Sequence, residues 1–393
     1  MIIFALALPL VVGAGALSVE TSFEYITQTR LQVAADAAAY AGALDNRAGL
    51  GLSQIAANAS SVAKSNGWSS ASGTILVNNP PTSGPNQDAT AVEVKLSQNV
   101  PRFFTAVFSS APIVVHARAV AIYRTAADAC ILALNQTASQ AVNVQGNTNV
   151  NLVGCDVMSN SIANDAINVQ GSAKISTDCV VSAGGVSNSG GLTLTGATCP
   201  SAITQAPRAR DPFAGLPIPS QGPNRSIPNK NGTIELSPGN YSHGMSLQGD
   251  FILDPGVYYV SGGDFSINAN ANVVGDGVTI FVQNGSSVSM MGNAHVALSA
   301  PTSGTYSGIL FFGDPGATGG LNKFNGDGTS LLTGDLYFPT QQVTYQGNFS
   351  GKNGCVQVVA DTVQWTGNAT IAVDCSAQGM AKIPARQAVK LVE

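Results

Sequence analysis

The chain opens on an uninterrupted apolar segment. Residues 1–19 contain no charged side chain, and Glu20 ends the run. A helix of that length spans roughly 29 Å, close to the thickness of the hydrocarbon core of a bilayer. The pattern therefore predicts a transmembrane anchor over 1–19, whose apolar side chains include Ile2, Phe4, Leu6, Leu8, Leu10, Val12 and Leu17.

A secretory signal peptide is the competing interpretation of this segment. Signal peptides usually place about 7–15 apolar residues between a basic start and a small-residue cleavage site. Ala14, Gly15 and Ala16 offer such a site, but the run is longer, no Lys or Arg precedes it, and helix-forming sequence follows it. We therefore expect a retained anchor, with the natural start upstream of Met1.

The anchor leads into an Ala-rich helical segment. Residues 30–41 read RLQVAADAAAYA, and alanine has the highest helix propensity. Small side chains let helices approach closely. We therefore expect the helix over 31–44 to pack against a helix of a partner protein through a face formed by Leu31, Ala34, Ala35, Ala38 and Ala41.

Residues 20–125 are expected to form this long helix and a small α/β domain, which is pilin-like in outline. Apolar spacing predicts a second helix that Gly67 terminates. The residues after it alternate between apolar and polar, as half-buried strands do. The order that follows is strand, strand, short helix and strand, over 74–77, 89–96, 101–108 and 113–123.

The rest of the chain reads as repetitive β structure. AVNVQGN at 141–147 recurs as AINVQGS at 166–172, an offset of 25 residues, which is typical of stacked structural units. Strands with Gly-Asn or Gly-Asp turns continue through 232–376. We predict two β-solenoid segments resembling a parallel β-helix, over 126–200 and 232–376, although a β-sandwich with coincidental spacing is an alternative. A Pro-rich linker or strap over 201–231 separates them, and a tail follows at 377–393.

Composition narrows the functional classes. Charged residues make up 10% of the chain and the net charge is −5, with no Lys/Arg cluster, so a nucleic-acid partner is not expected. The hydrophobic content of 44% does not fit a disordered chain.

All six cysteines lie in the β region, and an even number behind a membrane segment points to disulfides in an oxidising compartment. Cysteines one coil apart would stack closely, so bridges between neighbouring coils are plausible, and the last two cysteines could clip the final coils. Six cysteines allow 15 pairings, so the sequence leaves the connectivity open. The candidates are Cys130, Cys155, Cys179, Cys199, Cys355 and Cys375.

The search for catalytic patterns finds none. The sequence has no nucleophile elbow, P-loop or metal-ligand spacing, and we predict no enzyme activity, cofactor or metal. The acidic residues of the distal region, including Asp335, mostly stand beside Gly or Pro, as turn residues do. Four aromatic residues could line a polysaccharide-binding face, although core packing is their commoner role: Tyr241, Tyr258, Tyr259 and Trp365.

Several segments resemble the TadG-like (TadE/TadG-like) proteins of bacterial tight-adherence Flp pilus loci. The likeness begins with MIIFALALPLVVGAGALSVE and TRLQVAADAAAYAGAL, and continues through AVEVKLSQNVPRFFTAVF and VVHARAVAIYR. Further on, SPGNYSHGMSLQGDFILDPGVYYV and VALSAPTSGTYSGILFF look like the β domain of such proteins.

The resemblance implies a non-catalytic protein of pilus biogenesis. It would be a single-pass protein of the inner membrane, with its bulk periplasmic or at the cell surface. Its expected partners are inner-membrane lipid and other pilus-assembly proteins, of the pseudopilin or TadE-like kind. The alternative is a surface adhesin or a polysaccharide-binding β-helix protein.

Overall fold

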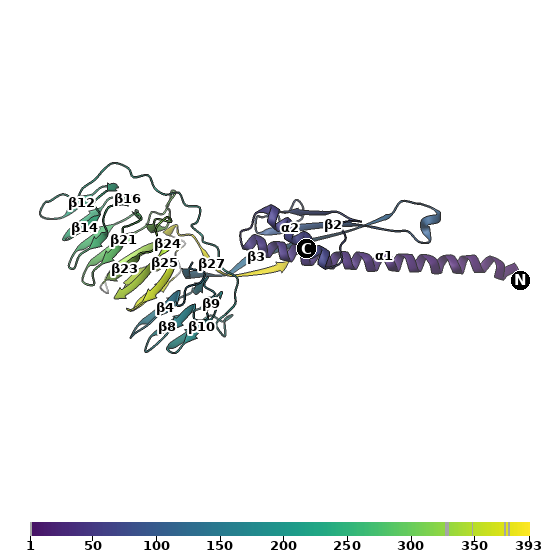
Figure 1. The fold of residues 1–393 in the computed structure, drawn as a ribbon, viewed down its shortest axis with the longest axis horizontal. Coiled ribbons are helices and arrows are strands. Elements are labelled where there is room, and N and C mark those ends of the chain that lie inside the picture. The colour runs from purple at the N-terminus through teal and green to yellow at the C-terminus, as the bar shows by residue number, and fades with distance from the viewer. Residues whose placement is uncertain (1, 327–329, 348, 373–374, 376–377) are drawn as a thin grey trace. The chain divides into compact units, whose positions relative to one another are not determined.

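In this computed structural model the backbone is described for residues 2–326, 330–347, 349–372, 375 and 378–393. Side chains are described from residue 11 onward, except at 125–126, 326, 347, 349–354, 369–372 and 387. The chain forms two compact units, residues 1–125 with 387–393, and residues 126–386 (Figure 1). The first is a small α/β unit and the second is a parallel β-solenoid, which confirms the predicted fold class.

The first unit contains the elements expected from the sequence. Helices α1 (Ile2–Arg47) and α2 (Leu52–Ser65) precede the antiparallel strands β1 (Ile75–Asn78), β2 (Ala91–Val100) and the first part of β3 (Ile113–Ala133). A single 3-10 turn, η1 (Thr105–Val107), forms where a short helix was predicted. Gly67, at φ +98°, ends α2 with a backbone conformation that other residues rarely adopt.

The C-terminal residues also belong to the first unit. Strand β27 (Ile383–Leu391) leads into residues whose backbone groups meet β3. The Val120 amide donates to the Glu393 carbonyl at 2.9 Å, and the Val392 amide donates to the Val120 carbonyl at 2.9 Å. The sequence predicted a separate tail over 377–393, of which residue 377 lies outside the described residues. Residues 387–393 instead form part of the α/β unit.

The solenoid begins with three coils of three short strands. The end of β3 starts the first coil, and each strand pairs in parallel with the strand one coil away. Val142 pairs with Ile167 and Asn143 with Asn168, so the 25-residue repeat is the length of one coil. The other strands are β4 (Val142–Val144), β5 (Asn149–Val153), β6 (Asp156–Ser159), β7 (Ile167–Val169), β8 (Lys174–Thr177), β9 (Cys179–Ser182), β10 (Val186–Asn188) and β11 (Gly191–Leu194).

A second series of parallel coils follows after residue 231. Gly-rich turns link these strands, and the longer β24 and β25 each bend around more than one face of the coil. The strands are β12 (Ile234–Leu236), β13 (Gly239–Tyr241), β14 (Met245–Leu247), β15 (Asp250–Leu253), β16 (Gly256–Val260), β17 (Phe265–Ile267), β18 (Asn272–Gly275), β19 (Val278–Val282), β20 (Val288–Met290), β21 (His295–Ser299), β22 (Ile309–Gly313), β23 (Leu321–Gly326), β24 (Leu331–Gly347), β25 (Phe349–Trp365) and β26 (Ala369–Ala372).

The two series join into one continuous solenoid. Val358 of β25 pairs in parallel with Ile131 of β3, Val363 pairs with Val142, and β26 pairs with β5. In Figure 1, β25 accordingly lies beside β4, although they come from opposite ends of this unit's sequence. The last coil of the chain therefore stacks on the first, and the junction has the same parallel hydrogen bonding as any other pair of coils.

The Pro-rich segment 201–231 runs as a strap along the outside of the solenoid. Its Ile203 forms an isolated parallel β-bridge with Val181 of β9, and its Asn224 forms another with Asn240 of β13. Between these points the Phe213 ring packs 5.1 Å from Tyr337, centroid to centroid, and is 5% exposed. The strap thus carries the chain from the last coil of the first series to the first coil of the second.

The strap has a physical reason to lie there, because it helps to cover an outward-facing apolar row. The row crosses eight paired strands through the junction and consists of Tyr259, Phe281, Phe312, Tyr337, Val359, Leu132, Met158 and Val181. These side chains are buried together with Phe213 of the strap and Ile383 of β27. Strands β19 and β22 are buried at every position, as continuous apolar runs are in sheets covered on both faces.

The aromatic side chains lie in the interior rather than on a sugar-binding face. Tyr258 and Trp365 are 0% exposed, Tyr241 is 2% exposed and Tyr259 is 6% exposed. Coil-to-coil stacking explains this, because each ring packs on the ring of a neighbouring strand, as Tyr345 does on Trp365 at 6.2 Å. The four aromatics thus have the core-packing role that the sequence favoured, and they do not form the alternative polysaccharide-binding face.

The six cysteines form three disulfides, Cys130–Cys155, Cys179–Cys199 and Cys355–Cys375. Their Cα atoms lie 5.6, 5.6 and 5.3 Å apart, within the usual range. Cys130 and Cys155 are a coil length apart, so this bridge joins neighbouring coils.

The junction can be tested by engineered cross-linking. Asn143 of β4 is the register partner of Gln364 of β25, so adjacent-strand spacing puts their Cα atoms about 5 Å apart. We expect the Asn143→Cys/Gln364→Cys variant to form a disulfide that mass spectrometry detects. Thr344 lies one coil beyond Gln364, so the Asn143→Cys/Thr344→Cys control spans about 10 Å and should not cross-link. Equal cross-linking of both pairs would contradict the continuous solenoid.

Candidate functional site

The N-terminal helix is a single element of 46 residues. Its first turns carry the predicted anchor, but the side chains of Ile2, Phe4, Leu6, Leu8 and Leu10 lie outside the described residues. Val12 and Leu17 are 61% and 53% exposed. Within the part of the chain that the structure describes, no helix is sufficiently long and apolar to cross a membrane.

The alanine face of α1 packs inside its own unit. Leu31, Ala34, Ala35 and Ala38 are at most 2% exposed, and Ala41 is half-buried. The four buried residues form a core with apolar residues of α2 and β2. The expected partner helix is thus replaced on this face by elements of the same chain, because the small side chains let α2 and the sheet approach closely.

Gly42 shows how close that approach is. A Cβ at this position would lie 2.9 Å from Val92 Cγ1 and 3.3 Å from Ile55 Cγ2. Contacts under 3.0 Å are essentially not found for real Cβ atoms, so a side chain at this position would force Val92 or α1 to shift. The Ala/Gly-rich sequence is thus explained by internal packing.

A different face of α1 is left uncovered in this chain. Apolar side chains recur on it every seven residues, which is one of the two apolar positions that each heptad of a coiled coil contains. This exposed stripe consists of Val12, Val19, Ile26, Val33 and Tyr40, which are 61%, 60%, 48%, 54% and 43% exposed. The sequence pattern did not predict this stripe, because the neighbouring alanines indicate helix packing more strongly.

Glu20, the first charged residue after the apolar run, is 2% exposed and holds a loop against α1. Its carboxylate accepts hydrogen bonds from the backbone N–H groups of Phe103, Phe104 and Thr105 at 3.3, 3.1 and 2.8 Å. The Thr105 hydroxyl donates a further bond of 2.6 Å. The pKa of Glu20 lies below its usual value, chiefly because the Thr105 hydroxyl donates to the carboxylate. Desolvation raises this pKa, but the backbone N–H donors lower it further.

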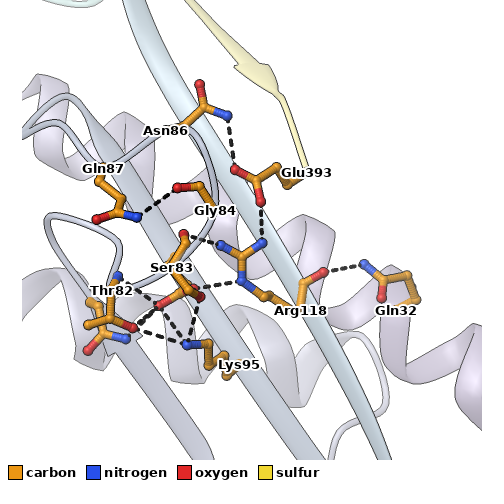
Figure 2. A network of polar contacts seen from close by, with 11 residues as sticks. Gln32, Thr82, Ser83, Gly84, Asn86, Gln87, Lys95, Arg118 and Glu393 are labelled. Carbon is orange, nitrogen blue, oxygen red and sulfur yellow. Dashed lines mark hydrogen bonds and ion pairs between the residues drawn. The ribbon is translucent and has the colours of Figure 1, made fainter.

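A second buried carboxylate organises a polar cluster in the first unit, and Figure 2 shows Lys95, Arg118 and other residues of this cluster. The side chain of Glu93 on β2 is 0% exposed and pairs with Arg118 Nε at 2.6 Å and with Lys95 Nζ at 3.1 Å. Asn78 and the Thr82 hydroxyl donate to it at 2.8 and 2.9 Å. Burial opposes ionisation, but hydrogen bonds led by those from Asn78, Arg118 and Lys95 outweigh it and hold the pKa of Glu93 well below its usual range.

Arg118 connects this cluster to three other segments. Its guanidinium also pairs with the Glu393 carboxylate and donates to the Ser83 carbonyl at 2.7 Å. Gln32 of α1 donates to the Arg118 carbonyl at 2.9 Å (Figure 2). These contacts join the 82–87 loop, α1 and the C-terminal residues to the sheet. With every member paired to protein groups, the arrangement is that of a structural clamp rather than a reacting centre.

Stacked amides link neighbouring coils of the solenoid, with one Asn pair buried and one Gln pair partly exposed. Asn168 donates to Asn143 at 3.0 Å, and Gln170 donates to Gln145 at 3.0 Å, each one coil away. Gln145 and Gln170 also line an open depression of about 590 Å³, together with Gly146, Gly171, Ser189 and Thr366. Such donors and acceptors suit the hydroxyl groups of a sugar chain.

Two carboxyl groups of the solenoid are fully buried, those of Asp156 and Asp335. Asp335, expected to be a turn residue, is 0% exposed, and burial raises its pKa well above the usual value. Asp156 pairs with Arg386 at 2.7 Å. Among the residues that the structure describes, no group of three or more His, Cys, Asp or Glu side chains could hold a metal ion.

Comparison with known proteins gives one match. Residues 1–46 match a family model described as "Putative Flp pilus-assembly TadE/G-like". Searches of curated proteins and of solved structures give no match to the chain. The matched segment is nearly the whole of α1, which carries the apolar run, the alanine face and the exposed stripe. The match supports a pilus-related role and a place in the cell envelope.

Proposed function

We propose that this chain is a non-catalytic, membrane-anchored envelope component of bacterial Tad/Flp pilus biogenesis, with a TadG-like role in assembly or structure. The family match over residues 1–46 carries the proposal. In this proposal, the apolar residues 1–19 hold the protein in the inner membrane as a single-pass anchor. The α/β unit and the solenoid lie on the periplasmic side or at the cell surface, where disulfides persist.

Two features of the fold support a structural role. The α/β unit encloses a charged cluster whose members are satisfied by one another, and the solenoid stacks its coils around an apolar core. Such stacks are stabilised mainly by neighbour contacts and present long, rigid surfaces. A rigid solenoid in the same chain as a membrane helix suits a spacer or an interaction platform in an envelope assembly.

The test is a count of surface pili, by electron microscopy, on cells that lack the gene and on cells complemented with it. We expect filaments to be lost in the first case and restored in the second. Normal filament numbers on the deletion cells would contradict a role in assembly. Normal filaments with weakened attachment would instead favour an adhesive role.

The partner within the assembly would contact the exposed stripe of α1. Because the alanine face is covered internally, the seven-residue spacing of Val33 and Tyr40 is the available pattern for packing with a helix of another pilus component. A photo-crosslinking residue at Val33 is expected to capture such a protein in cells. The control is Gln28, which is exposed on another side of α1. Equal capture from both positions would contradict the assignment of this face.

A second candidate function rests on two stacked glutamines of the solenoid. The Gln145 and Gln170 side chains line an open depression and favour binding to an extended polysaccharide. These amides, rather than the aromatic residues, would be the binding element. Glycan-array binding by the full chain, lost in a Gln145→Ala/Gln170→Ala variant, would support this function. A blank array would count against it.

A further inference from the structure

The loop that Glu20 holds exposes an unusual amount of apolar surface. Residues 101–109, the aromatic loop, follow β2 and contain η1. Phe103 and Phe104 are 50% and 49% exposed, while Val107 and Phe108 reach 85% and 88%. Apolar side chains gathered at one exposed site commonly mark a contact with another molecule or with a membrane.

Its attachment point places the aromatic loop at the end of the apolar segment. Glu20 is the first charged residue after residues 1–19, and it binds three consecutive backbone N–H groups of the loop. The Phe103 ring also packs edge-on against Phe23 of α1, with centroids 5.1 Å apart. If residues 1–19 cross the bilayer, the loop lies where α1 leaves the hydrocarbon region.

The chemistry of the loop matches that level of a membrane. Aromatic side chains favour the interface between headgroups and acyl chains. The one charged residue of the segment is Arg102, a cation suited to anionic headgroups. The nearby carboxylate of Glu20 already accepts four hydrogen bonds from the loop, so contact of the loop with lipid would not leave this carboxylate unpaired.

We infer that residues 103–108 insert into the interfacial region of the bilayer that α1 enters, and form a second membrane contact beside the anchor. The inference rests on the proposed membrane anchoring. The surface that these residues contact is a phospholipid bilayer containing anionic lipid. Two contacts restrict the rotation of the α/β unit about α1 and so fix which face of that unit points along the membrane.

The test uses the full chain in phosphatidylethanolamine–phosphatidylglycerol vesicles that contain acyl-chain-brominated lipid. The two native tryptophans, Trp68 and Trp365, are 4% and 0% exposed. Their fluorescence, measured in the parent protein, is the background that is subtracted. A Phe108→Trp variant reports the aromatic loop. Leu76→Trp on β1, at a position 53% exposed in the same unit, is the matched control. Leu17→Trp reports the anchor itself.

We expect the added emission to be quenched in Phe108→Trp and in Leu17→Trp but not in Leu76→Trp. Quenching of Leu17→Trp without Phe108→Trp would overturn the membrane contact of the loop while leaving the anchor intact. Absence of quenching in both would overturn the loop contact and the anchor together. An unquenched but blue-shifted Phe108→Trp emission would mean that protein covers the loop, which also overturns the inference.

Discussion

Reducing the three disulfides is expected to destabilise the solenoid strongly while sparing the α/β unit. Each bridge closes 20 or 25 residues of chain, so its loss should cost about 3 kcal/mol of unfolding free energy. Because a domain typically has only about 5–15 kcal/mol of stability, losing all three leaves little margin. The measurement is urea unfolding of a Trp68→Phe variant, followed by Trp365 fluorescence with and without a reductant.

The α/β unit provides an internal control for this experiment. Every cysteine lies between residues 130 and 375, within the second unit. A Trp365→Phe variant leaves Trp68, which is buried in the first unit, as the reporter. Its unfolding midpoint should not move on reduction. A shift of both reporters by the same amount, or of neither, would contradict the assignment of disulfide stabilisation to the solenoid.

Replacing Glu93 by glutamine is expected to destabilise the α/β unit by about 1.5–3 kcal/mol, because Lys95 and Arg118 lose the buried carboxylate with which they pair, while Arg118 keeps Glu393. Glutamine keeps the shape of the side chain, so the loss reports charge rather than packing. Urea unfolding followed by Trp68 measures it. Glu24→Gln, at a half-buried position on α1, is the control and should change the midpoint little.

The same substitution should change the response to acid. The pKa of Glu93 is lower in the folded state than its usual value of 4.5, which applies to the unfolded chain. The stability that this carboxylate contributes is therefore fully present above about pH 4.5 and is lost as the pH falls towards the folded-state value. Glu93→Gln should flatten that part of the stability profile below pH 4.5. An unchanged acid profile would contradict the role assigned to the cluster.

Sequence patterns determined the local elements of this protein. The apolar and Ala-rich runs predict one long helix, Gly67 predicts the end of α2, and alternation predicts β2. The repeat at 141–147 and 166–172 predicts stacked coils, and the structure pairs those residues in register. These features depend on residues that are a few positions or one coil apart in the sequence. The spacing of apolar and repeated residues therefore predicts them directly.

The candidate site could be predicted only in part. The alanines were expected to pack against a helix of a partner protein, whereas the structure buries them against α2 and β2 of the same chain. The Glu93 cluster left no signal, because it joins residues from 32 to 393. The exposed stripe of α1 could be recognised only once the structure showed that the alanine face of the helix is buried within the same chain.

Tertiary structure alone decided how the β segments combine. The sequence predicted two solenoid segments and a strap, and it contained nothing that specified β25 as the neighbour of β3 and β4. The reason is physical: a parallel strand edge offers the same backbone hydrogen bonds to any strand of suitable twist. The choice of partner depends on side-chain rows that become continuous only when coils more than 200 residues apart in the chain are stacked, as Val359 and Leu132 are.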